Sequence, residues 1–98
     1  MDPAHQVVQG FHQQDLDPLW PYARHVHVRQ ARPGYLQARL EGGTIDFAAV
    51  VGSLQAVGYD GAICVENILL PDAAWLTSDC LDPVAETVAL RDLLRTLV

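Results

Sequence analysis

The chain has 98 residues, half of them hydrophobic, which allows one small domain with a buried core and argues against a disordered chain. Twelve acidic residues against six basic ones, all arginine, give a formal net charge of −6. Because a surface this acidic repels phosphate backbones, we expect no nucleic acid as ligand.

The arginines are unevenly distributed. Four of them fall in residues 24–39, a window that contains no acidic residue: Arg24, Arg29, Arg32 and Arg39. They are either a local anion site on an acidic body or four solvated surface side chains, and the sequence leaves both interpretations open.

Signals for export or membrane insertion are not expected. The N-terminus has no basic region followed by an apolar run, and no apolar stretch approaches the roughly 20 residues that cross a bilayer. The two cysteines, Cys64 and Cys80, have neither metal-ligand spacing nor a disulfide pattern, and Cys64 lies in an apolar run typical of a core. We therefore expect a cytoplasmic protein that contacts no membrane.

The first quarter of the chain predicts little regular structure. Residues 1–12 are expected to form a loop with some apolar character. A short helix follows, with Asp15 or Asp17 as its cap, Pro18 in its first turn and Pro21 limiting its length.

Strict alternation over residues 25–29 predicts a strand. Two valines lie on one face of that strand, and the opposite face carries His25, His27 and Arg29. Residues 32–43, bounded by Pro and Gly pairs, are expected to form a long loop.

The strongest helix pattern spans residues 47–57, between Asp46 as N-cap and Gly58 as stop. Its predicted apolar stripe consists of Phe47, Val50, Val51, Leu54 and Val57.

A second strand is expected at residues 62–66, with Ile63 and Val65 on one face and Glu66 on the other. A loop at residues 67–81 then contains Pro71, Trp75 and Ser78.

Asp82 and Pro83 predict the start of a last helix. Its buried side is expected to consist of Val84, Val88, Leu90, Leu94 and Leu97.

This alternation of helices and strands favours an α/β domain with parallel strands joined by crossover helices. The carboxyl ends of both strands then lie at one edge, where open α/β sheets and barrels build their sites. His27 and Glu66 are the polar residues expected to meet there. Imidazole and carboxylate together suit a divalent ion such as Mn, Co or Zn, whereas carboxylate and water favour Mg. Solvent exposure in an open cleft would satisfy the carboxylate equally well.

Five segments of the chain resemble the xylose-isomerase-like (β/α)8 barrels, the sugar phosphate isomerase and epimerase group. They are DPAH at 2–5, HVHVRQA at 25–31, GGTIDF at 42–47, GYDG at 58–61 and CVE at 64–66. The resemblance covers nearly the whole chain. It implies that residues 1–98 are one partial barrel domain, running from the end of strand six to helix eight.

The resemblance also implies residue roles. Asp2, His27 and Glu66 would bind the divalent metal, and Glu66 would also move protons at the carbon being isomerised. The substrate, a sugar or sugar phosphate, would be contacted by His5, His25 and Arg32. A metal bound to both oxygens of an enediolate stabilises its charge.

Other features depart from that family. A (β/α)8 barrel needs about 250 residues, and the second proton-moving glutamate of the family, on strand five, is not in this chain. Asp2, beside the terminus, is expected to be poorly held, and the 47–57 stripe to find few partners. The chain would then need a complementing chain or a homo-oligomer for activity. The alternatives are a non-catalytic interaction fragment and a decayed barrel remnant.

The metal-dependent endonucleases of abasic DNA share the barrel but carry an Asp-x-His pair after strand seven. This chain has IDF at residues 45–47 instead. That difference and the acidic balance disfavour a DNA-repair function.

Overall fold

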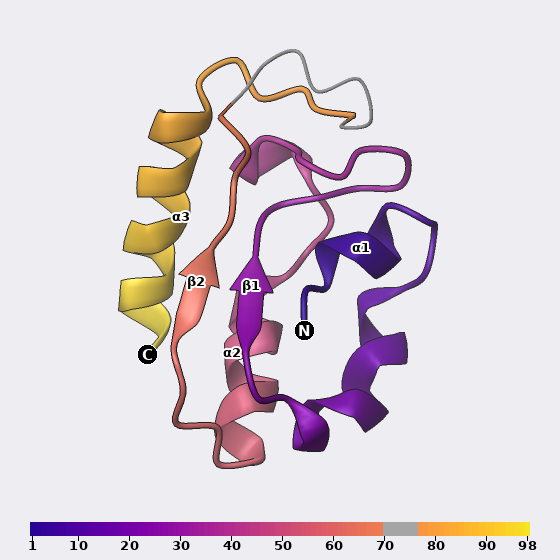
Figure 1. Cartoon of the computed structure of the whole chain (residues 1–98), viewed down its shortest axis with the longest axis vertical. Coiled ribbons are helices and arrows are strands. Elements are labelled where there is room, and N and C mark those ends of the chain that lie inside the picture. The colour runs from indigo at the N-terminus through magenta and orange to yellow at the C-terminus, as the bar shows by residue number, and fades with distance from the viewer. Residues whose placement is uncertain (70–76) are drawn as a thin grey trace.

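Helices and strands alternate along residues 1–69 and 77–98, the part of the chain that the computed structural model describes (Figure 1). In chain order the elements are helix α1 (Ala4–Val7), 3₁₀ helix η1 (Gln13–Tyr22), strand β1 (Val26–Val28), 3₁₀ helix η2 (Leu40–Gly42), helix α2 (Phe47–Ala56), strand β2 (Ile63–Val65) and helix α3 (Pro83–Leu97). The predicted α/β class is confirmed. Pro71 and Trp75 of the expected 67–81 loop lie outside the described residues.

The two strands pair in parallel, as predicted, with Val26 opposite Ile63 and His27 opposite Cys64. Helix α2 lies between them in sequence, so the connection is a crossover of the βαβ kind. The ladder continues past the strands, because the Glu66 amide donates to the Val28 carbonyl at 2.9 Å. Both strands therefore have their carboxyl ends at the same end of the sheet, called its carboxyl edge here, which is drawn toward the top of Figure 1.

The other side of β1 pairs with the first residue of the chain. The His27 amide donates to the Met1 carbonyl at 2.9 Å, and the Met1 amino group donates to the His25 carbonyl. This is the bond pattern of a parallel neighbour. The spatial order is thus Met1, β1, β2, and residue 2 arrives at the same edge as the ends of both strands.

A single hydrophobic core joins the strands to the helices. Helix α3 contacts α2 and β2, and η1 contacts α2. The core includes Ala4, Val7, Leu16, Trp20, Val26, Val28, Phe47, Val50, Val51, Leu54, Leu90 and Leu94. The stripe of α2 is therefore covered within this chain, and the expectation that it would find few partners is wrong.

The predicted helix ends of α2 and α3 are confirmed. Asp46 accepts from the Ala49 amide at 3.1 Å, and Asp82 accepts from the Ala85 amide at 3.0 Å. Gly58 follows α2 with φ of +72°, a conformation that favours glycine.

Other local predictions are wrong. Residues 1–12 contain α1, and η1 begins before Asp15, whose carboxylate accepts from the His12 amide at 3.0 Å. Prolines 18 and 21 lie inside η1 rather than bounding it.

Several apolar side chains predicted to be buried are exposed. In α3 the predicted set mixed two faces, because Val84 and Val88 lie on average about 120° around the helix from Leu90 and Leu94 at 3.6 residues per turn. Val57 follows the last residue of α2 and turns outward. Cys64 is half-buried rather than a core residue.

Candidate functional site

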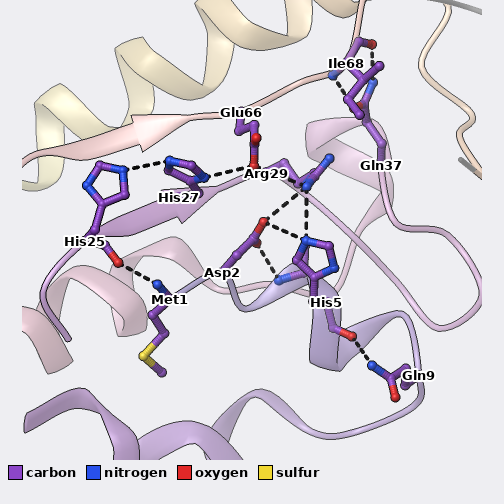
Figure 2. A network of polar contacts seen from close by, with 11 residues as sticks. Met1, Asp2, His5, Gln9, His25, His27, Arg29, Gln37, Glu66 and Ile68 are labelled. Atoms are coloured by element: carbon purple, nitrogen blue, oxygen red, sulfur yellow. Dashed lines mark hydrogen bonds and ion pairs between the residues drawn. The ribbon is translucent and has the colours of Figure 1, made fainter. Parts of the chain in front are cut away.

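Polar side chains from three segments meet where the parallel strands end (Figure 2). Asp2 follows Met1, His27 lies in β1, and Arg29 follows the last residue of β1. Glu66 follows the last residue of β2. Because all these segments run in one direction, their side chains gather at one edge, here called the rim site: Asp2, His5, His25, His27, Arg29 and Glu66.

The predicted meeting of His27 and Glu66 is confirmed. His27 Nδ1 lies 3.0 Å from Glu66 Oε2, although the two residues are 39 positions apart in sequence. The Glu66 side chain is 44% exposed, so a ligand in solvent can reach its carboxylate.

The second ring nitrogen of His27 contacts His25. The two Nε2 atoms are 2.8 Å apart, and the rings meet edge to face with their centroids 4.6 Å apart. A carboxylate accepts only, so a neutral His27 must carry its proton on Nδ1. Its Nε2 then accepts from the Nε2–H of His25. The rim site thus contains a row of carboxylate, inner imidazole and outer imidazole.

Arg29 is the member of the rim site that the candidate residues did not include. Its Nη2 lies 3.2 Å from Asp2 Oδ2, 3.4 Å from Glu66 Oε2 and 3.4 Å from His5 Nε2. The residue is only 3% exposed, and its Nε and Nη1 are buried without a hydrogen-bond partner among residues 1–69 and 77–98. Strand alternation had placed Arg29 on the face of His25 and His27, which was the available signal. The arginines of residues 24–39 were interpreted either as a local anion site or as solvated surface side chains, and the second interpretation is wrong for Arg29.

Asp2 is held firmly, contrary to expectation. One carboxylate oxygen accepts from the Ala4 amide at 3.0 Å, at the start of α1, and the other contacts Arg29. The Asp2 side chain is 11% exposed. His5, one turn along, lies 3.4 Å from the same carboxylate and is more than half exposed.

The donor types of the rim site suit a divalent metal, but their present arrangement does not. A metal bound to Asp2 and Glu66 would lie about 2.0–2.2 Å from their oxygens. Arg29 Nη2 already lies between those oxygens, and its positive charge opposes a second cation there. Within residues 1–69 and 77–98, no three histidine, cysteine, aspartate or glutamate side chains are grouped as metal ligands. Metal binding by Asp2, His27 and Glu66 stays a prediction that requires Arg29 to move.

Arg32, the predicted contact for a substrate hydroxyl or phosphate, makes other contacts. Its Nη2 lies 3.1 Å from Asp79 Oδ2, and its guanidinium carbon lies 3.5 Å from the centre of the Tyr35 ring. The hydrogen bond to Asp79 raises the pKa of Arg32, although desolvation acts in the other direction. Binding of substrate by Arg32 stays a prediction.

Two buried glutamines fix the segment that follows β1, and no pattern in the sequence indicated either of them. Gln30 accepts from the amides of Ala31 and Ile45 and donates to the carbonyls of Leu40 and Ile45. Gln37 forms two bonds with the backbone of Ile68, at 2.7 and 3.1 Å. These side-chain bonds add to the backbone bonds of the same segments and stabilise the chain beyond both strand ends.

The fold and the rim site define a small α/β domain with a parallel strand pair and an ionisable cluster at its carboxyl edge. No family model matches the chain, and no curated protein or solved structure is significantly similar to it. None of the described helices has the length and apolar content needed to cross a bilayer.

Proposed function

We propose that the chain is a sugar or sugar phosphate isomerase or epimerase module, built as part of a (β/α)8-type barrel. In this proposal Glu66 removes the proton from the carbon next to the ligand carbonyl and leaves an enediolate. The second glutamate that the resemblance implies returns a proton, to the former carbonyl carbon in an isomerase or to the opposite face of the same carbon in an epimerase. The observation that supports it best is the double contact of Glu66 Oε2, with His27 Nδ1 at 3.0 Å and Arg29 Nη2 at 3.4 Å.

These contacts fit a general base. A carboxylate must be held in one orientation and remain reachable by the substrate. His27 and Arg29 hold one oxygen of Glu66, and its partial exposure leaves room for a ligand. The exposed imidazole of His25 lies beyond His27 and can contact a ligand hydroxyl, as the resemblance implies.

The spatial order of Met1, β1 and β2 supports the barrel part of the proposal, because strands six, seven and eight of such a barrel are neighbours in that order. The resemblance implies a second glutamate on another strand. In this proposal a second copy or a complementing chain supplies it.

The experiment is deuterium incorporation from solvent into a panel of ketoses and ketose phosphates, followed by proton NMR. We expect exchange at the carbon beside the carbonyl with the wild-type chain and its loss in Glu66→Gln. Glu41→Gln is the matched control, since Glu41 is 80% exposed and outside the rim site. Exchange that survives Glu66→Gln, or no exchange with any compound, would contradict the proposal.

A second candidate function, self-association without catalysis, is favoured by one groove. It has a volume of about 550 Å³ and lies between β2 and the end of α3, lined by Ile63, Val65, Leu94 and Val98 with Arg91 and Arg95 beside them. Among the described residues, β2 pairs only with β1. Arg91 already pairs with Asp92 at 2.9 Å, but Arg95 complements a chain of net charge −6, so the favoured occupant is a second copy.

Sedimentation velocity over a range of concentrations tests this candidate. Self-association that weakens in Arg95→Glu supports it. A monomer at all concentrations counts against it and leaves the isomerase proposal to the exchange experiment.

A further inference from the structure

We propose that the Arg29 guanidinium takes the place of a divalent cation in the rim site, so that the site binds its ligand and transfers the proton without a metal. The inference rests on the proposed function for the reaction, but its main evidence is the arrangement of Arg29 itself.

The first observation is that a single atom makes the contacts. Arg29 Nη2 alone lies within 3.2–3.4 Å of two carboxylate oxygens and of the His5 ring nitrogen. Arginine ordinarily presents its fork to one carboxylate and uses two nitrogens. Here one nitrogen lies among three possible ligand atoms, as a metal ion would, and Figure 2 shows these contacts converging on it.

The second observation is the burial of the guanidinium. Arg29 is 3% exposed, and its Nε and Nη1, although both are buried, have no hydrogen-bond partner in the described part of the chain. Unpaired buried donors of a charged group are costly. The position is therefore held by the charges of Asp2 and Glu66 rather than by saturation of its hydrogen bonds.

The third observation is the charge balance. Asp2 and Glu66 together carry two negative charges, and Arg29 supplies one positive charge between them. A divalent ion at the same oxygens would face a guanidinium that is only 3% exposed. Removal of Arg29 would leave the two carboxylates and the His5 imidazole that contact its Nη2, which is a donor set suited to Mn²⁺, Co²⁺ or Zn²⁺.

The experiment compares the binding of Mn²⁺ and Zn²⁺ to the wild-type chain, Arg29→Ala and Arg29→Lys by isothermal titration. We expect no site-specific binding by the wild type, and at least tenfold tighter binding by Arg29→Ala. We expect that gain to be lost when Glu66→Gln is added. Arg29→Lys keeps a cation and should remain like the wild type.

Micromolar metal binding by the wild type that is lost in Asp2→Asn or Glu66→Gln would overturn the inference. So would a folded Arg29→Ala chain that gains no affinity. If Arg29→Ala does not fold, the wild-type titration alone decides: no site-specific metal binding supports the inference, and micromolar binding overturns it.

A deuterium-exchange assay with EDTA separates this inference from the proposed function. Exchange that persists in EDTA supports both the metal-free inference and the proposed function. Exchange that stops in EDTA and returns with Mn²⁺ overturns the inference and leaves the proposed function standing. If no exchange occurs at all, the proposed function fails and the metal titrations still test Arg29.

Discussion

His27 Nδ1 and Glu66 Oε2 lie 3.0 Å apart across two parallel strands, where His27 is the middle residue of β1 and Glu66 directly follows the last residue of β2. This contact depends on the strand direction, because an antiparallel pair would put the two residues at opposite ends. It also depends on the register, in which His27 pairs with Cys64 and Glu66 follows two positions later.

The first prediction concerns the core that supports the strands. Leu54 is 2% exposed within α2, so Leu54→Ala leaves a cavity. We expect a loss of about 2–5 kcal/mol in the free energy of unfolding, measured by urea denaturation. The matched control is Leu81→Ala, since Leu81 is 91% exposed, and it should change the value by less than about 0.5 kcal/mol. Equal losses in both variants would contradict the placement of α2.

The second prediction contrasts two glycines. A Cβ at Gly43 would collide with the Gln30 side chain, which bonds both sides of the loop, whereas a Cβ at Gly52 in α2 would meet open space. Gly43→Ala should therefore destabilise the chain by about 1–3 kcal/mol. Gly52→Ala should stabilise it by about 0.5–1 kcal/mol through helix propensity. Thermal melts of both variants test this contrast. A change in Tm of the same sign in both variants would argue against a fixed Gln30 side chain beside Gly43.

The third prediction uses the pKa of Asp79. Desolvation acts to raise this pKa, but hydrogen bonds from the Arg32 side chain and the Arg39 backbone outweigh it and leave it below 3.8. A carboxyl group with a lowered folded-state pKa stabilises the fold above its unfolded pKa and loses that contribution as pH falls through the folded value. Asp79→Asn should lower Tm near neutral pH, and this loss should shrink as pH falls below 3.8.

The control for the third prediction is Asp60→Asn, because Asp60 is exposed. That variant should leave Tm close to the wild-type value at neutral pH. A loss of Tm in Asp79→Asn that is the same at every pH would show that the Asp79 carboxylate charge is not responsible.

Much of the fold was predictable because its signals are local. The Asp46 and Asp82 caps and the stop at Gly58 each depend on a few neighbouring residues. Alternation over residues 25–29 likewise predicted the strand and the face of His27. The helix predicted between the two strands indicated the parallel direction that brings His27 to Glu66.

The incorrect and missing predictions have a common physical cause, which is that burial of a side chain depends on its tertiary neighbours. An arginine on a strand face has the same local pattern whether it is solvated or buried, so Arg29 was not distinguished from Arg24. Gln30 and Gln37 bond segments that are distant in sequence, and no periodicity indicates such bonds. In α3, two apolar faces were present in the sequence, and only packing against α2 and β2 selects the one with Leu90 and Leu94.

The carboxylate of Glu66 holds His27 in one orientation at the rim site. A long-range ¹H–¹⁵N correlation spectrum of the histidine side chains tests this orientation, with His27→Gln used to assign the signals. We predict that neutral His27 carries its proton on Nδ1, and that Glu66→Ala removes this preference. A His27 ring protonated on Nε2, unchanged by Glu66→Ala, would show that Glu66 does not orient His27.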